Sequence, residues 1–449
     1  FHTVHPPFLL NCNILGKKNN IYRENYNILW KLTAAGDICG IPGKNKHRRE
    51  RELKKYFKLL FRALAAVFCV ALPVRYNLPD KIYTSDRRQA EIGRVPEIKL
   101  IAKDRQIYAD RTDARYEAKL FGLIKVKEVT VSQKETRYVA VSGEPFGLKM
   151  FCDGVMVVGF SDILTADGYK NPAKNAGLKI GDIVTAINGK KVQTNEDVGE
   201  IISKCRGQEI TVEYLRNDTE KTAQITAVYD KNIGAYRSGM WVRDSSAGIG
   251  TMTFYDIEKG LFAGLGHGIK DIDTGKEIRL LSGETVPVKI TGVTKSKNGS
   301  AGRLKGSFSS VRASGKILKN TSVGVYGKIY SAGDYRLMPV ANEIEIKPGK
   351  AYILTCIDGQ EPKSYEIQIE KIYLNSKDRT KNMVIKITDK ELLDKTGGIV
   401  RGMSGSPIIQ NGKLVGAVTH VFVNRVHRGY RIFAQNMLTA LDSAEENTK

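Results

Sequence analysis

Alternation of apolar and polar residues dominates the chain from about Lys125 onward. The stretches KVKEVTV and RYVAVSG alternate with a period of two, and DGVMVVGF follows them as a further apolar run. A period of two is typical of half-buried strands. From about Gly234, short apolar runs are separated by Gly-rich turns, and a helical pattern appears only late, around Ala434–Leu441. Such spacing favours a β-barrel or sandwich, so we predict a mainly β fold.

A helix is predicted within the first part of this β-rich region. Thr194 or Asn195 can cap it, and Gly207 ends it. Its apolar face consists of Val198, Ile201, Ile202 and Cys205. The preceding run AGLKIGDIVTAINGKKV contains an Asn-Gly pair of the kind found in hairpin turns. This run resembles the A-G-L-x-x-G-D-x-[IV]-x-x-[IV]-N-G pattern of PDZ domains.

The resemblance to PDZ domains implies a peptide-binding function. Such domains bind the C-terminal end of a peptide as an added strand. Gly147, Leu148 and Lys149, just before a strand, are the expected counterpart of the loop that receives the terminal carboxylate. The groove would then lie between the helix from Glu196 and the strand after Leu148. A PDZ fold that acts only as a spacer is the alternative.

An apolar segment at residues 54–74, KKYFKLLFRALAAVFCVALPV, follows a basic run. Its clean apolar part, Ala63–Val74, is short for a spanning helix, which needs about 20 residues, and also fits a signal sequence. Basic residues on the N-terminal side predict that the following chain is exported. A buried core helix is the alternative, and the pattern does not decide whether the segment is retained or cut.

These observations divide the chain into five parts. Residues 1–53 are expected to be a basic extension, either cytosolic or spurious, and residues 54–74 a signal or transmembrane segment. Residues 75–120 are charged and irregular, which indicates a linker. We expect the PDZ domain at residues 121–230 and a second, strand-rich domain at residues 231–449.

Composition limits the possible partners and cofactors. The 449 residues carry a net charge of +23, and residues 1–62 hold thirteen Lys and Arg against four acidic residues. Because few basic runs elsewhere are interleaved with aromatic residues, we expect membrane contact through the N-terminal segment and no nucleic-acid partner. The six Cys show no paired spacing and no C-x-x-C, which argues against a zinc site or a disulfide scaffold. No metal or cofactor is expected.

The candidate chemistry lies in GMSGSP, residues 402–407, between two apolar β-branched runs. A turn between strands explains the Gly, Ser and Pro residues equally well. A Ser between Gly residues can also expose its hydroxyl while neighbouring N–H groups face a developing oxyanion. The cluster is therefore either a turn or a nucleophile loop.

A Ser nucleophile requires a base, which is most often His. Three of the six His precede the export segment, which leaves His267, His420 and His427. His267 stands between two Gly residues, where its ring can be exposed. His420 lies in an apolar run, where a packed ring is expected, and His427 lies in a basic loop. His267 is therefore the favoured base.

A third group must orient the imidazole. Asp389, at the end of the apolar strand MVIKIT, is best placed to project into a site, and Asp394 is second. The remaining candidates between His267 and Ser404 are Asp271, Asp273, Asp334, Asp358 and Asp378.

GMSGSP is similar to the G-D-S-G-G-P signature of trypsin-like serine proteases. The similarity implies a double β-barrel with Ser404 as nucleophile and the N–H groups of Gly402 and Ser404 as oxyanion hole. Met403 replaces the Asp of the signature, so the ion pair of that Asp with a freed N-terminus cannot form here.

Residues 126–449 also resemble the stage IV sporulation protein B family, the PDZ-containing signalling serine peptidases of endospore-forming bacteria. The resemblance rests on WVRDSSAGIGTMTFYD, GLGHGI and VIKITDKELLDKTGGIVRGMSGSPIIQNGKLVGAVTHVFVN, together with the PDZ run. It implies His267 as base, Asp389 as third member and Ser404 as nucleophile. Asp389 lies only 15 residues before Ser404, which is unusually close for a trypsin-like enzyme.

The resemblance also implies a biological task. The chain would be membrane-anchored at first and exported across the forespore membrane into the space between forespore and mother cell. There it would cleave itself and a regulatory subunit of an intramembrane protease complex, which triggers late sigma-factor processing. A catalytically silent PDZ scaffold at the membrane is the alternative. A quality-control protease is disfavoured because the PDZ domain usually follows the protease in such enzymes.

Overall fold

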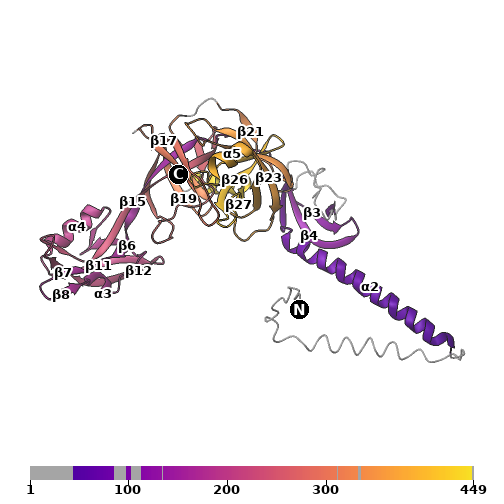
Figure 1. Cartoon of the computed structure of the whole chain (residues 1–449), viewed down its shortest axis with the longest axis horizontal. Coiled ribbons are helices and arrows are strands. Elements are labelled where there is room, and N and C mark those ends of the chain that lie inside the picture. Colours follow the sequence, from indigo (N-terminus) through magenta and orange to yellow (C-terminus); the bar gives the residue numbers. More distant parts are fainter. Residues whose placement is uncertain are drawn as a thin grey trace, which may run out of the picture. The chain divides into compact units, whose positions relative to one another are not determined.

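A computed structural model of the chain describes residues 44–84, 98–102, 113–133, 135–310, 312–331 and 335–446 (Figure 1). Strands predominate from residue 81 onward, which confirms the predicted mainly β class. Most of the predicted N-terminal extension lies outside the described residues.

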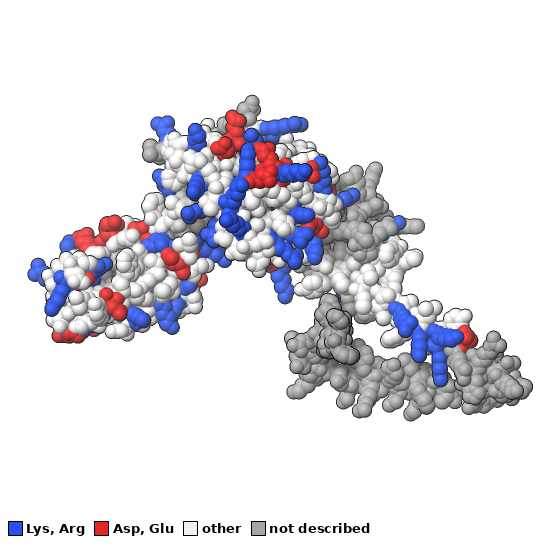
Figure 2. Space-filling model, in the orientation of Figure 1, with Lys and Arg blue, Asp and Glu red and all other residues white. Residues whose placement is uncertain are grey.

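The first described element is the long helix α2, Lys44–Asn77. Its part Glu52–Asn77 is long and apolar enough to cross a membrane, and none of the most apolar stretch is buried by the protein. Lys and Arg side chains gather on the N-terminal part of this helix, and an uncharged stretch follows (Figure 2). The predicted segment 54–74 lies within this helix, which is compatible with a membrane anchor or a signal sequence.

A small four-stranded sheet follows the helix. Its strand order is β1-β4-β3-β2, and β1 runs parallel to β4. The buried side chains of Leu78, Ile82, Val129 and Val131 belong to its core. The strands are β1 (Lys81–Thr84), β2 (Ile98–Ala102), β3 (Asp113–Leu120) and β4 (Ile124–Gln133). The predicted linker 75–120 therefore contains folded strands, whose many charged residues on the exposed face hid the alternation.

The first of two barrels in the rest of the chain is a closed ring of six strands. Pairing runs β6-β17-β19-β20-β16-β15, and β15 pairs again with β6 to close the ring. The strands are β6 (Pro145–Phe160), β15 (Met240–Asp256), β16 (Leu261–Gly264), β17 (Leu280–Thr294), β19 (Gly315–Thr321) and β20 (Gly324–Ile329). Outside the PDZ elements, three further strands extend this sheet: β5 (Tyr138–Val141), β18 (Arg303–Phe308) and β21 (Leu337–Pro339).

The second barrel is also closed, in the order β22-β23-β24-β27-β26-β25. Its strands are β22 (Gly349–Thr355), β23 (Lys363–Ile372), β24 (Met383–Ile387), β25 (Pro407–Gln410), β26 (Lys413–Val421) and β27 (Arg428–Phe433). Helix α5, Lys390–Thr396, lies between β24 and β25 in the chain, and α6, Ala434–Glu446, follows β27. Met437, Leu438 and Leu441 of α6 pack in one cluster with residues of both barrels. The double barrel is the architecture that the trypsin-like resemblance implies.

The PDZ part contains the predicted helix as α4, Asn195–Lys204. Thr194 caps it, and Asp197 completes a reciprocal capping box. Val198 and Ile202 are buried against the strands, as their spacing predicts. The other elements are β7 (Ile163–Thr165), β8 (Gly168–Lys170), α3 (Pro172–Asn175), β9 (Ile183–Ile187), β10 (Lys190–Lys191), β11 (Glu209–Arg216), β12 (Thr219–Thr226), β13 (Val228–Asp230) and β14 (Ala235–Arg237).

Two long strands connect the PDZ part to the first barrel. β6 pairs with β17 through its first half, from Phe146 to Cys152, and with β9 further on, at Val155 and Met156. β15 runs beside β6 throughout, from Met240 to Thr251 (Figure 1). The PDZ elements are therefore inserted between two strands of the first barrel. This differs from the predicted boundary at residue 230, because both strands continue from one part into the other without a turn at the border.

Candidate active site

The nucleophile loop, residues 402–406, has a backbone that only Gly permits at two positions. Gly402 and Gly405 have φ values of +101° and +93°. A Cβ atom on Gly405 would lie 1.9 Å from the Thr251 carbonyl oxygen, because the loop passes directly over strand β15. Thr251 also fixes the loop, since its N–H donates to the Ser404 carbonyl over 2.9 Å and its hydroxyl to the Gly402 carbonyl over 2.8 Å. These contacts hold Ser404 at the junction of the two barrels.

His267 is presented by a tight turn after strand β16. Leu265 and Gly266 both have positive φ values, 68° and 70°. A Cβ on Gly266 would lie 2.9 Å from a methyl group of Ile432, so the turn packs directly on the second barrel. Asn320 secures the following residues by accepting from the Ile269 N–H over 2.8 Å and donating to the Ile269 carbonyl. The imidazole is thereby held at a fixed position facing the nucleophile loop.

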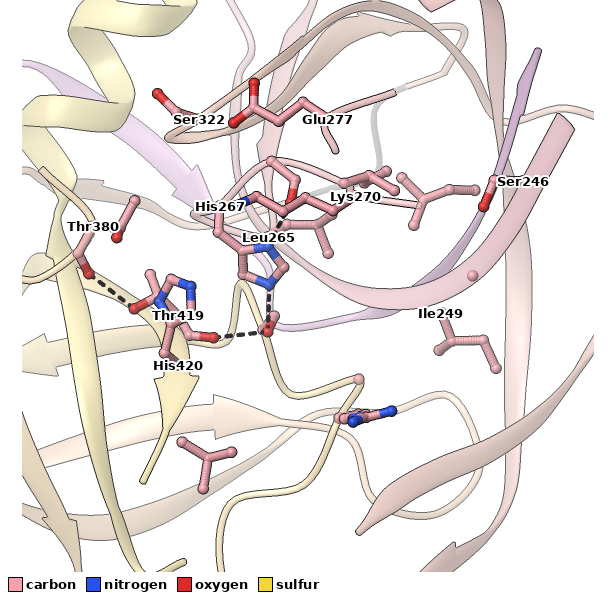
Figure 3. A pocket seen from close by; sticks show the side chains of 18 of the residues that line it. Ser246, Ile249, Leu265, His267, Lys270, Glu277, Ser322, Thr380, Thr419 and His420 are labelled. Carbon is pink, nitrogen blue, oxygen red and sulfur yellow. Dashed lines mark hydrogen bonds between the residues drawn. The ribbon is translucent and has the colours of Figure 1, made fainter. Parts of the chain in front are cut away.

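Both ring nitrogens of His267 have hydrogen-bond partners (Figure 3). Nε2 lies 2.9 Å from the Ser404 hydroxyl, and Nδ1 lies 2.9 Å from the Gly268 carbonyl oxygen. Because a carbonyl only accepts, Nδ1 carries the proton and Nε2 is left as the acceptor. The Ser404 hydroxyl also lies 3.1 Å from the Thr419 carbonyl oxygen, so its single proton has two acceptors. The arrangement joins the two residues that the sequence predicts as base and nucleophile.

Desolvation lowers the pKa of His267 below its usual value of 6.5. The hydrogen bond to the Gly268 carbonyl opposes this change, and the positive charge of Lys270 adds to it. The imidazole is therefore neutral near pH 7, which is the form that can accept a proton from Ser404.

Two backbone N–H groups beside Ser404 are available to a ligand. Among the hydrogen bonds of the described residues, neither the Gly402 N–H nor the Ser404 N–H has an acceptor. The neighbouring amides are engaged, since Met403 donates to Val400 and Gly405 to Val418. Unpaired N–H groups next to a nucleophile are the donors that stabilise an oxyanion.

Asp389, the expected third member, does not contact His267. Its carboxylate caps helix α5 by accepting from the Leu392 N–H over 3.0 Å, and it accepts from the Glu366 N–H over 3.3 Å. Gly268 supplies the Nδ1 acceptor instead. Helix α5 begins directly after Asp389. The need for a helix N-cap therefore explains an Asp at this position as well as a catalytic role does.

A cavity of about 740 Å³ surrounds His267 and Ser404. His420, expected to be packed, instead lines this cavity with its ring centroid 5.3 Å from that of His267 (Figure 3). Desolvation and the nearby His267 lower the pKa of His420 to about 4. Asp378 lines the cavity too, and although burial raises its pKa, hydrogen bonds from Lys381 and Thr380 lower it to about 2.

The residues expected to form the PDZ carboxylate loop lie elsewhere. Gly147, Leu148 and Lys149 belong to the barrel half of β6 and pair with β15 and β17. Leu148 is buried and lines the cavity around Ser404, and the Lys149 ammonium lies 5.4 Å from the Phe308 ring centroid. These residues therefore serve the peptidase barrel.

A groove of about 340 Å³ runs beside α4 in the PDZ part. One wall consists of α4 residues, among them Val198, Gly199 and Ile202, and the other of residues 235–242. The strands beside the helix are thus β14 and the start of β15, which follow α4 in the chain. The predicted groove exists at the helix, but its second wall comes from β14 and β15 and not from the strand after Leu148.

Sequence reasoning missed three contributors to the site: Thr251, Thr419 and the Gly268 carbonyl. The two Thr residues act partly through backbone atoms, which carry no residue-specific signal. The exposure of His420 gave no signal either, because it ends a continuously buried run and a β-bulge between Val418 and His420 interrupts the alternation of β26.

Comparisons with known proteins agree with this geometry. Residues 234–438 match the family described as SpoIVB peptidase S55, and residues 166–227 match the PDZ domain family. The peptidase match contains both His267 and Ser404.

Individual relatives match only short parts of the chain. Protease Do-like 1, chloroplastic, of Arabidopsis thaliana is 34% identical over 104 residues, which cover 20% of this chain and 24% of that protein. Zinc metalloprotease RasP of Shouchella clausii is 35% identical over 60 residues, or 13% of this chain and 14% of that protein. The matches thus span about a quarter or less of these relatives.

Among solved structures, the PDZ domain of an SdrC-like protein from Listeria monocytogenes is 25% identical. The matched region covers 20% of this chain and 87% of the Listeria chain, and the TM-score is 0.16. The two family matches together show that the chain contains a serine peptidase domain of the SpoIVB S55 type, residues 234–438, and a PDZ domain, residues 166–227.

Proposed function

We propose that the protein is an exported serine endopeptidase in which Ser404 is the nucleophile and His267 the base. The observation that carries this proposal is the 2.9 Å contact between His267 Nε2 and the Ser404 hydroxyl. A nucleophile and a base at this distance, with the base oriented by a further acceptor, form the minimal unit of nucleophilic acyl transfer.

The reaction proceeds in two stages. Ser404 attacks the scissile carbonyl while its proton passes to Nε2 of His267, and the N–H groups of Gly402 and Ser404 stabilise the oxyanion. His267 then gives the proton to the leaving amine, which leaves an acyl-enzyme. Water, deprotonated by the same nitrogen, attacks the ester carbonyl, and the proton returns to Ser404 as the acid product leaves.

The PDZ groove supports a second part of the proposal, the binding of peptide C-termini. Its walls are α4 on one side and β14 with the first residues of β15 on the other, a helix and strand segments as in other PDZ grooves. The ligand is either the end of this chain or that of a partner protein.

The cellular part of the proposal concerns sporulation. The apolar helix α2 with its basic N-terminal part supports export and initial membrane anchoring. Membership of the S55 family supports a signalling role in endospore formation. The substrates are then the chain itself and a regulatory subunit of an intramembrane protease complex, so that cleavage triggers late sigma-factor processing in the space around the forespore.

Self-cleavage provides the test. The full chain is produced with membranes, and the mass of the mature protein is followed over time. We expect shortening in the parent and in Ser406→Ala, which removes a buried hydroxyl two residues from the nucleophile, and none in Ser404→Ala.

Equal shortening of Ser404→Ala would refute the mechanism. Stable, folded protein that is never shortened and cleaves no partner subunit would instead favour the alternative, a catalytically silent PDZ scaffold at the membrane.

A further inference from the structure

The hairpin between β3 and β4 exposes an unusual apolar tip. Its residues Leu120 to Ile124 read LFGLI, and the side chains of Phe121, Leu123 and Ile124 are 57%, 84% and 39% exposed. Three neighbouring apolar side chains at a loop tip expose a patch that a purely water-facing turn does not need.

The backbone of the tip is strained in the same place. Phe121 and Gly122 have φ values of 51° and 72°, and the Leu123 N–H donates to the Leu120 carbonyl over 3.1 Å. A two-residue turn with positive φ at both positions favours Asn-Gly or Asp-Gly. A bulky Phe in this conformation is uncommon and unfavourable. Neither the conformation of the turn nor its exposure to water therefore explains why a Phe occupies position 121.

The hairpin lies beside the end of helix α2. Thr130 of β4 donates to the Asp80 carbonyl, Lys127 donates to the Leu78 carbonyl, and Arg75 donates to the Val126 carbonyl over 3.0 Å. Going back along β4 from Thr130 to Val126, the contacts therefore move back along the preceding segment from Asp80 to Arg75. The tip directly precedes these contacts in the chain, and Val74 at the end of the helix packs against the core of the same small sheet.

Charged side chains follow the tip on both strands. Lys119 and Lys125 both pair with Glu117, and Lys125 also pairs with Glu128. Long Lys side chains next to an apolar tip can keep their ammonium groups at the level of lipid headgroups while the tip lies deeper. This order of apolar tip and flanking Lys matches the change from hydrocarbon to headgroup at a bilayer surface.

We infer that the tip, Phe121–Ile124, inserts into the surface of the lipid bilayer from which α2 emerges. Two contacts with the membrane, helix and tip, then fix the orientation of the small sheet and restrict its rotation about the helix axis. The inference rests on the proposed membrane insertion of α2, and its test separates the two.

A photo-crosslinking amino acid at position 123 of the full chain, reconstituted in vesicles of phosphatidylcholine and phosphatidylglycerol, tests the contact. The matched control is position 169, since Tyr169 is 74% exposed at another hairpin, β7–β8. We expect a phospholipid adduct by mass spectrometry at position 123, at least tenfold above position 169. Protein that floats with the vesicles but gives no lipid adduct at 123, or an adduct with a second protein chain, overturns the inference.

Protein that does not float with vesicles would contradict membrane insertion of α2, and with it the inference. Phe121→Asn provides an independent check, because Asn tolerates the left-handed turn. We expect an unchanged or higher melting temperature and a several-fold weaker lipid adduct at position 123. An unchanged adduct in this variant contradicts a role for Phe121 in lipid contact.

Discussion

A single backbone carbonyl occupies the place that a carboxylate holds in a Ser-His-Asp triad. Gly268 accepts the Nδ1 proton of His267 and so fixes the tautomer in which Nε2 accepts. A neutral carbonyl forms a weaker bond to the imidazolium than a carboxylate does, since hydrogen bonds with an ionised partner are roughly twice as strong. The site therefore fixes the orientation of His267, but it stabilises the imidazolium form less than a site with a carboxylate at Nδ1 would.

The first prediction concerns pH. The pKa of His267 lies below 6.5, chiefly through desolvation and further through Lys270, and the base works only when neutral. Activity is thus present above this pKa and lost as pH falls through it. We expect the acidic limb of kcat/KM for a peptide substrate to have its midpoint below 6.5, and Lys270→Gln to move it upward. A midpoint at or above 6.5 in the parent would contradict this account.

The second prediction separates an N-cap from a triad member. Asp389→Asn preserves a capping side chain but removes the charge, so we expect kcat/KM within a few-fold of the parent. Asp389→Ala should lower the free energy of unfolding by about 1 kcal/mol through loss of the cap. If Asp389→Asn lowers kcat by about 10⁴, as in a true triad, Asp389 acts on His267 in the working enzyme.

Strand β15 links the two binding sites at the scale of elements. Its first residues, Met240 to Val242, line the PDZ groove, and Ser246 to Ile249 line the cavity at Ser404. Between them, Arg243 pairs with Asp271 and Asp273 in the loop after His267. One continuous strand thus contributes to the groove, to the cavity at Ser404 and, through Arg243, to the loop after His267.

The third prediction tests this connection. Arg243→Ala leaves the buried Asp271 without its ionic partner and loosens the loop after His267, so we expect kcat to fall at least fivefold. The matched control is Arg279→Ala, since Arg279 also pairs across the two parts, with Asp218, but its contact is exposed and 3.4 Å long. If both variants are folded and have equal kcat, Arg243 does not position the loop after His267.

At the scale of the whole molecule, the peptidase is assembled from separated parts of the chain. Its first barrel takes β6 from before the PDZ elements and β15 from after them. An inserted domain whose two connecting strands are adjacent can be removed without opening the barrel.

The fourth prediction follows from this insertion. Replacing residues 153–243 by a short Gly-Ser hairpin should leave a folded peptidase with a cooperative thermal transition. A fragment of residues 231–449 should fail to fold, because β15 and β17 lose β6 as their shared neighbour. If the fragment 231–449 folds and the variant without residues 153–243 does not, β6 is not a strand of the peptidase barrel.

The residue pattern predicts the catalytic pair and helix α4, but it does not predict how the PDZ domain is inserted or which group accepts the Nδ1 proton. Ser404 and His267 were predictable because both lie in Gly-rich turns and in motifs that resemble those of serine peptidases, and α4 was predictable from its cap and apolar face. The insertion of the PDZ domain was not, because β6 and β15 cross the border as unbroken strands. The Nδ1 acceptor could not be foreseen either, since a backbone carbonyl leaves no trace in residue type.

Intact-mass measurement of labelling by a fluorophosphonate tests the central claim most directly. We predict one adduct per chain, located on Ser404, lost in Ser404→Ala and slowed by orders of magnitude in His267→Ala. An adduct that forms as fast in Ser404→Ala, or folded parent protein that forms none, would contradict the account.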